Sequence, residues 1–461
     1  MTGRTTSRRR SWQLVAVLAV LFALLAGACG SDSSSGESDD NGGGTQTTGD
    51  LTENVTVDAP GVTDTEIKYS VLATGTGNPT GQCLLDCYTT GIQAYFDYVN
   101  TEMGGIYGRQ LVAEDLVDDE FGKHQEKALE IIAADDTFAT FSNTVVPAGF
   151  QSFADENIPL YVWATNPTAM QGNESIFGEV TVRCLEVGCW DRSVPYQMKI
   201  SGRTKLAAVG YGIAQSSKDC AQNQAKSVEE FKDQIGDDAE AVYMNDNLPF
   251  GMSNGAAPEV TAMKNAGANV LVTCIVNNDT KTIMQEAERQ GLDIVPLIPQ
   301  GYDDAELERM GGAFDGGYIR NTLRSFQADL NEAQEKYLEY TAKNGGQVSE
   351  VTIYGWINAA LAYEGLKLAG PDFDRDKVVD ATNTLTAFTA DGLTPPMNWT
   401  TGHTAPTKDD ASNNNEYECY SMMKIEDSKF VLEGDPAKPF FCWPGTNWDW
   451  EDGYPEQMSF D

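Results

Sequence analysis

Residues 137–163 read TFATFSNTVVPAGFQSFADENIPLYVW, in which two short apolar runs enclose a mostly polar stretch. The runs at 137–141 and 158–163 are rich in β-branched and aromatic residues, as buried strands are. The chain between them has room for one helix, which we expect to begin near Pro147. The stretch therefore predicts a β-α-β unit with two parallel strands.

The same alternation continues in both directions. Toward the N-terminus it predicts strands at 66–72 and 111–116 and helices at 89–103 and 123–134, the first of them stopped by Gly104 and Gly105. Toward the C-terminus it predicts strands at 206–210, 239–244, 270–276 and 294–298 and helices near 220–234, 258–266 and 281–290. The fold class is therefore α/β with parallel sheets.

Chain length favours two lobes. The part from residue 62 onward is about 400 residues long, which exceeds what one hydrophobic core normally covers. After Arg324 the pattern becomes helical at 328–343 and 351–369, and then irregular and polar from 389 to 416. The aromatic tail contains Trp443, Trp448 and Trp450, and we expect it to be a packing strap, with a sugar-stacking or wall-binding platform as the alternative.

The N-terminus predicts export. The first ten residues carry four arginines, and an apolar run at 14–25 follows that is short for a membrane span. Residues 25–29, LAGAC, resemble the lipobox of bacterial lipoproteins. We therefore expect a signal peptide at 1–28, a lipid on Cys29 that anchors the protein to the outer face of the cytoplasmic membrane, and a flexible tether at 29–61. An ordinary secretory cleavage, with Cys29 unmodified, is the alternative.

The charge excludes some partners. The formal net charge is −38, and loss of a leader that contains four arginines and no acidic residue makes it about −42. Such a chain does not suit nucleic acid, nor electrostatic adsorption to anionic lipid.

The cysteine count favours disulfides. Nine cysteines less Cys29 leave eight, in an exported chain. The short spacings pair Cys83 with Cys87 and Cys184 with Cys189, and zinc is the alternative, although no histidine lies near either pair. Cys220 and Cys274 follow the first and third strands of the second unit, which are commonly neighbours in doubly wound sheets, so we pair them. Cys419 and Cys442 then form the fourth pair.

Four stretches carry a family resemblance: GVTDTEIK at 61–68, AYFDYVN at 94–100, GGIYGRQL at 104–111 and PAGFQSFADENIPLYVWATNP at 147–167. They resemble the branched-chain amino acid binding proteins of ABC transporters, which are type I periplasmic binding proteins. The resemblance implies two Rossmann-like lobes joined by a multi-strand hinge, with the ligand in the cleft between them. It implies lobe 1 at 62–180 and 325–400, lobe 2 at 181–324 and 401–435, and leaves the strap at 436–461.

The resemblance also implies a ligand site in the first lobe. Ser142 and Thr165, the latter following Ala164 in the ATNP stretch, match the hydroxyl residues that hold the ligand's carboxylate in the family. Hydroxyls and backbone amides at Ser142, Asn143 and Thr144, ahead of a helix, also suit an anion. A plain helix N-cap is the alternative.

The second lobe departs from the family pattern. Gln300 stands where the amino acid binders carry an acidic residue for the ligand's ammonium group, and Ser216 and Asn277 stand where aromatic residues are expected. A neutral amide cannot give the charge-assisted bond that a desolvated ammonium needs. We therefore expect a ligand with a carboxylate or similar oxygen group and a flat or apolar body, held by Trp163 and Tyr302. The alternative is that both aromatic residues belong to the core.

These features predict a monomeric, non-catalytic solute-binding lipoprotein that captures a small amino-acid-like, carboxylate or amide compound and serves the permease and ATPase of an ABC importer. No cofactor or metal motif is found in the sequence. The two histidines, His124 and His403, lie in no catalytic motif. A ligand-sensing module that acts through a partner membrane protein is the alternative function.

Overall fold

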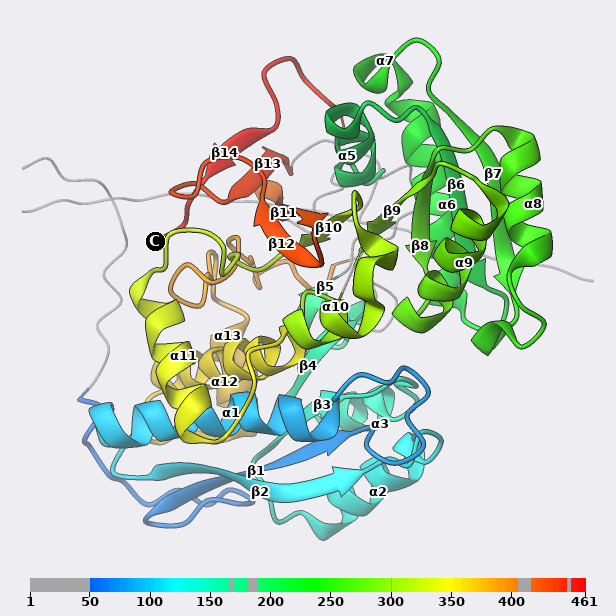
Figure 1. Ribbon diagram of the computed structural model, residues 1–461. Coiled ribbons are helices and arrows are strands. Elements are labelled where there is room, and N and C mark those ends of the chain that lie inside the picture. The colour runs from blue at the N-terminus through cyan, green and yellow to red at the C-terminus, as the bar shows by residue number, and fades with distance from the viewer. Residues whose placement is uncertain (1–49, 166–169, 181–189, 300, 405–415, 446–448) are drawn as a thin grey trace, which may run out of the picture. The chain divides into compact units, whose positions relative to one another are not determined.

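The computed structural model describes residues 50–165, 170–180, 190–299, 301–404, 416–445 and 449–461. Two β-sheets, each flanked by helices, account for this part of the chain (Figure 1). The predicted α/β class is confirmed, since both sheets contain a run of parallel strands.

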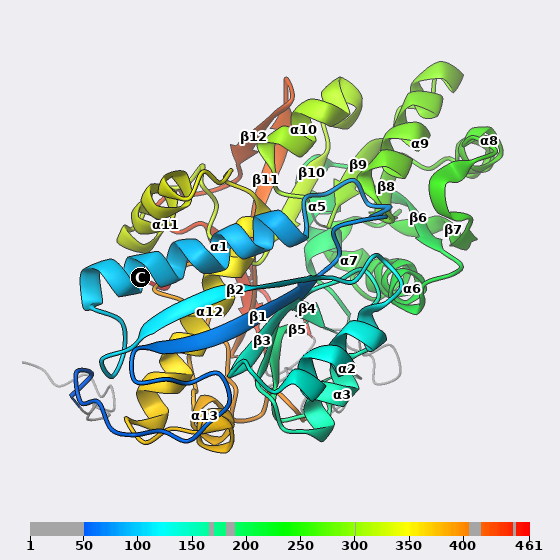
Figure 2. The ribbon, with the colours of Figure 1, turned by 90° about the horizontal axis from the view of Figure 1, so that it is seen from below.

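The first sheet has five strands in the order β2-β1-β3-β4-β5, and every neighbouring pair is parallel. Its strands are β1 (Glu66–Ala73), β2 (Gln110–Asp118), β3 (Ala139–Asn143), β4 (Leu160–Thr165) and β5 (Ile176–Val180). The helices packed with it are α1 (Leu85–Tyr98), α2 (His124–Ala134), α3 (Phe150–Asp155), α11 (Glu332–Lys343), α12 (Glu350–Ala369) and α13 (Arg375–Thr382). Figure 2 shows α1 and α12 on one side of the sheet and α2 and α3 on the other.

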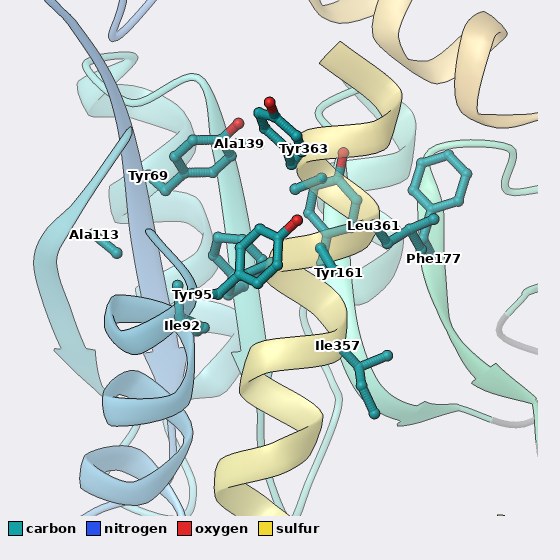
Figure 3. Close-up of a cluster of buried hydrophobic side chains, with 14 of the residues drawn as sticks. Tyr69, Ile92, Tyr95, Ala113, Ala139, Tyr161, Phe177, Ile357, Leu361 and Tyr363 are labelled. Carbon is teal, nitrogen blue, oxygen red and sulfur yellow. The ribbon is translucent and has the colours of Figure 1, made fainter. Parts of the chain in front are cut away.

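The core of this unit is aromatic and is built where α1 meets α12. A Cβ on Gly91 would lie 1.8 Å from the carbonyl oxygen of Thr352, and one on Gly355 would lie 2.3 Å from that of Tyr88, so only glycine allows these helices to approach so closely. Figure 3 shows side chains of α1, α12 and the sheet gathered in this core. Gly104 adopts the left-handed conformation, with φ of 77°, and ends the short π turn that continues α1, which confirms the predicted stop.

The second sheet has nine strands in the order β14-β13-β11-β10-β9-β8-β6-β7, with β12 paired to β11. Its strands are β6 (Lys205–Tyr211), β7 (Glu240–Leu248), β8 (Val270–Cys274), β9 (Val295–Ile298), β10 (Tyr318–Asn321), β11 (Tyr417–Glu426), β12 (Lys429–Leu432), β13 (Phe440–Pro444) and β14 (Glu456–Met458). Its helices are α5 (Ser193–Ser201), α6 (Gln215–Glu230), α7 (Lys232–Ile235), α8 (Ala257–Ala266), α9 (Asn277–Gln290) and α10 (Asp304–Met310). Strands β6 to β10 are parallel, and β11 to β14 add antiparallel pairs.

The C-terminal tail is part of the second sheet. Residues 436–461, which the sequence assigns to a strap, supply β13 and β14. Trp443 is fully buried and Trp450 is 8% exposed, and both pack with Phe231 and Phe441. These tryptophans therefore serve packing rather than a surface platform, while Trp448 lies outside the described residues.

The packed part of the chain begins earlier than the sequence suggests. Residues 1–49, with the predicted signal peptide and Cys29, lie outside the described part. The end of the predicted tether is docked on the first unit, because Arg109 donates to the Val55 carbonyl at 2.7 Å and Leu51 and Val57 pack against the core. Residues 51–57, which the sequence assigns to the tether, are therefore packed on the first unit. Of the helices described, none is long and apolar enough to cross a membrane.

Three disulfides join the cysteine pairs chosen from the sequence, at Cys83–Cys87, Cys220–Cys274 and Cys419–Cys442. Strands β6 and β8 are neighbours, as predicted, which brings Cys220 of α6 beside Cys274 at the end of β8. Cys184 and Cys189 lie outside the described residues.

Peptide mapping of the purified, unreduced protein is expected to recover Cys220 linked to Cys274 and Cys419 linked to Cys442, because the cysteines of each pair lie within bonding distance. Digestion with thiol blocking and mass spectrometry makes the measurement, and a reduced sample is the control. A blocked free thiol at Cys220 or Cys274 would contradict the assignment.

Candidate functional site

One pocket of about 720 Å³ lies where the parallel strands of both sheets end. In the first sheet its lining includes Val145, just after β3, and Trp163 in β4. In the second it includes Tyr211 at the end of β6, Cys274 at the end of β8 and Asn321 at the end of β10. Ligands of open α/β sheets bind at the carboxyl ends of the strands, and the volume suits a small organic molecule.

The walls are mainly aromatic and aliphatic. The ring of Trp163 lies 5.6 Å from that of Tyr354 on α12, and Tyr211 lies 5.0 Å from Phe250. One face of α12 supplies further lining residues at helical spacing, among them Ile357, which Figure 3 shows pointing away from α1. The surface favours a ligand with an extended apolar body.

The polar corner of the pocket is centred on one ion pair. Arg320 of β10 donates to Asp191 at 2.6 Å, and its guanidinium carbon lies 4.5 Å from the ring centre of Tyr420. Gln224 and Ser193 also donate to Asp191. Burial alone raises the pKa of Asp191, but Arg320 and the hydrogen bonds outweigh it and hold that pKa below its usual value. Asp191 is therefore ionised, and its carboxylate already has an ionic partner and hydrogen-bond donors within the protein.

A second buried pair stands beside the first. Arg192 has no exposed surface and donates to Glu418 at 2.7 Å and to the carbonyls of Asp449 and Pro444 at 2.8 and 2.9 Å. Burial raises the pKa of Glu418, and Arg192 opposes the shift. The pair joins the start of α5 to β11 and β13, next to the Asp191–Arg320 pair.

The predicted anion site of the first lobe faces inward. Ser142 is 1% exposed, and its Oγ lies 3.2 Å from His124 Nε2. The Thr144 hydroxyl donates to Asp119, which is also buried. Neither these residues nor Asn143 is among the lining residues of the pocket. Because β3 is fully buried, the side chains of Ser142 and Asn143 face the interior of the first unit and not the pocket.

Two backbone amides of the loop after β3 already donate hydrogen bonds within the protein. The Val145 amide donates to Thr74 at 3.1 Å, and the Gly149 amide donates to His124 Nδ1 at 2.8 Å. Backbone amides expected to be free for an anion are thus satisfied, and the carboxylate of Asp119 adds negative charge nearby. The loop contributes Val145 and Val146 to the pocket instead.

The other predicted residues are divided between pocket and core. Trp163 and Ser216 line the pocket. Asn277 begins α9 and is 8% exposed, away from this lining. Tyr302 is buried in the core of the second unit, and its hydroxyl accepts a bond from the Phe326 amide at 2.7 Å. Ala164 and Thr165 are the last residues of β4, with side chains that are not described, and Gln300 lies outside the described residues.

Sequence reasoning missed much of the pocket. It did not single out Asp191 and Arg320, the face of α12, or the segment 394–399 that forms another wall. The one usable signal was the position of Arg320 beside Tyr318 and Ile319, in the short stretch that forms β10. A charged residue within such a run needs a buried partner.

Comparisons with known proteins agree with this geometry. The sequence matches the profile of the periplasmic binding protein family over residues 67–429. A comparison with curated proteins gave no match. Similar solved structures include a solute-binding protein of R. palustris in complex with benzoate, with a TM-score of 0.59, 16% identity and coverage of 81% of this chain and 97% of that one.

Two further solved structures are similar to this chain. The branched-chain amino acid transporter substrate-binding protein of Streptococcus pneumoniae, in complex with isoleucine, has a TM-score of 0.60 and 15% identity, and covers 80% of this chain and 99% of its own. The fatty acid ABC transporter substrate-binding protein of Thermomonospora curvata has a TM-score of 0.58 and 18% identity, and covers 84% and 97%. At these identities the structures share the fold. Because the family profile spans most of the sequence, the chain belongs to the periplasmic binding protein family, as its sequence motifs indicate.

Proposed function

We propose that this protein is the extracytoplasmic solute-binding component of an ABC importer and captures a small organic ligand in the pocket described above. The carrying observation is the position of that pocket, at the carboxyl ends of the strands of two α/β units in a member of the periplasmic binding protein family. Similar structures hold benzoate or isoleucine or serve fatty acid transport, which fits a pocket with apolar walls. The permease and ATPase subunits are the partners, and the binding protein acts as a monomer.

Hinge closure is part of this proposal. We assign 62–180 and 325–400 to lobe 1, on which residues 51–57 are docked, and 181–324 and 401–435 to lobe 2, whose sheet continues into β13 and β14, with the chain crossing between the lobes. Ligand contacts with both lobes favour the closed form. A lipid on Cys29 holds the protein at the outer face of the cytoplasmic membrane.

We infer that the site binds its ligand without transforming it. Because the Gly149 amide donates to His124 Nδ1, the neutral ring carries its proton on Nε2 and donates it to Ser142 Oγ. That tautomer cannot take a proton from Ser142, so Ser142 and His124 are not arranged as a nucleophile and its base.

A thermal-shift screen of the purified protein tests the function. The panel contains amino acids, aromatic and aliphatic acids, amides, short peptides and sugars. A true ligand at one hundred times its Kd is expected to raise the free energy of unfolding by about 2.7 kcal/mol.

The hit is then measured on two variants. Trp163→Ala removes an aromatic wall of the pocket and is expected to abolish most of the shift, whereas Leu129→Ala changes a half-exposed side chain outside the pocket and retains it. Absence of any ligand response across the panel would contradict a transport role.

A further inference from the structure

The charged side chains that line the pocket already have ionic or hydrogen-bonding partners within the protein. Asp191 is paired with Arg320, and Glu418 with Arg192, as described above. The third acid, Glu350, accepts hydrogen bonds from the backbone amides of Gly301 and Tyr302, the latter at 2.9 Å. A charged group on the ligand would lose its hydration on entering the pocket and would find no free charged side chain to pair with among the described lining residues. Burying such an unpaired charge is unfavourable.

Uncharged side chains supply much of the hydrogen-bonding capacity that is open to a ligand. Within the described chain, four uncharged lining side chains carry a buried polar atom with no hydrogen-bond partner: Gln224 Oε1, Asn321 Nδ2, Thr394 Oγ1 and Trp399 Nε1. Each of these residues is at most 4% exposed. Buried polar atoms are normally paired, so four such atoms around one pocket indicate groups that a ligand satisfies. A carboxylate can accept from a donor but not donate to Gln224, and an ammonium cannot accept from Trp399.

The pocket is also long. Its lining follows one face of α12 from Glu350 through Tyr354 and Ile357 to Leu361, a span of twelve residues and about 16 Å along a helix. Beyond Glu350 this face carries no charge, and the facing segment contributes Met397 and Trp399. An amino acid would occupy a small part of such a surface.

We propose that the pocket selects an uncharged, elongated ligand, with an apolar body along α12 and a neutral acceptor oxygen that binds Trp399 Nε1 and Thr394 Oγ1. Amides, esters and ethers supply such an oxygen, and a primary amide also supplies a donor for Gln224. This inference rests on the proposed solute-binding function and narrows its ligand class. It replaces the carboxylate expected from the sequence, since none of Ser142, Asn143 and Thr144 lines the pocket.

Four probes with one body test the inference by titration calorimetry on the full protein: 4-phenylbutanamide, 4-phenylbutanoate, 4-phenylbutylamine and butylbenzene. The amide is expected to bind at least about tenfold more tightly than either charged analogue, because only it matches the neutral atoms without carrying an unpaired charge. Tighter binding of the carboxylate or the amine would overturn the inference.

Two matched variants locate the contact. Trp399→Phe removes the Nε1 donor and keeps an aromatic ring, so it is expected to weaken amide binding by about tenfold and leave butylbenzene binding unchanged. Trp443→Phe is the control, because Trp443 Nε1 also lacks a partner among the described residues but lies outside the pocket lining. Thr394→Val gives a second reading if Trp399→Phe is poorly folded.

The outcomes separate the two proposals. Unchanged amide affinity in both Trp399→Phe and Thr394→Val would overturn the Trp399 subsite, while ligand binding, and with it the proposed function, would stand. An amino acid that outcompetes all four probes would overturn the ligand class alone. If neither these probes nor the wider screen gives any binding, both the function and its ligand class fail.

Discussion

Arg192→Ala is expected to lower the free energy of unfolding by about 3–5 kcal/mol, which is the usual cost of removing one partner from a buried ion pair. The side chain of Arg192 is fully buried and donates to the Glu418 carboxylate and to the carbonyls of Pro444 and Asp449. Its loss leaves a buried charge and two acceptors unsatisfied at the junction of α5, β11 and β13. Chemical denaturation at pH 7 measures the change.

Two further variants separate this buried pair from ordinary surface charge. Arg203→Ala breaks the pair with Asp293, whose side chain is 83% exposed, and is expected to cost less than about 1 kcal/mol. Arg192→Ala combined with Glu418→Gln removes the stranded charge and is expected to recover part of the loss. Equal effects of Arg192→Ala and Arg203→Ala would show that the Arg192 network does not hold the C-terminal strands.

The parallel part of the fold was predictable because its signals are local. Short apolar runs gave β1 to β4 and β6 to β9 to within a few residues, and glycine after the helix explains the end of α1. The small fifth strand and the short helices α5 and α13 were missed, since elements of this length carry little periodic signal. Helix α12 was predicted, but it is buried on almost every side, so its pattern does not reveal which face meets a ligand.

The C-terminal strands were missed for a different reason. Strand β11 is ten residues long, yet it pairs with β10, which lies about one hundred residues earlier in the chain. Such pairing depends on contacts distant in sequence. The aromatic tail was expected to pack, and it does so in the form of strands. Its residues Phe441 and Trp443 complete a core with Phe231, which lies between α6 and α7.

The position of the pocket could be predicted from the sequence, but most of its lining residues could not. The rule that ligands meet the ends of parallel strands pointed to Trp163 and Ser216, which both line the pocket. It could not decide which way a side chain points: Ser142, on a strand buried on both faces, turns to His124. Nor could it pair Asp191 with Arg320, since 129 residues separate them.

Acidification from pH 7 to pH 5 is expected to destabilise the protein through its two histidines. Burial lowers the pKa of His124 and of His403 from 6.5 to about 4, and for His124 the nearby Asp119 opposes the shift only weakly. The unfolded chain therefore binds protons more readily than the folded one below pH 6.5. The stability is fully present above that pH and is lost as pH falls toward 4, by about 2 kcal/mol for each histidine at pH 5.

His124→Asn isolates the contribution of His124, because an asparagine oxygen can replace Nδ1 as the acceptor of the Gly149 amide but does not titrate. The free energy of unfolding is measured by denaturant titration at pH 7, 6 and 5 for the wild type, for His124→Asn, for His403→Asn and for the double variant. Each single variant is expected to lose about 2 kcal/mol of the pH dependence, and the double variant leaves only the carboxylates, which titrate mainly below this range. If His124→Asn retained the wild-type pH dependence, folding would not lower the pKa of His124, and the Gly149 amide would not hold the ring in the neutral tautomer.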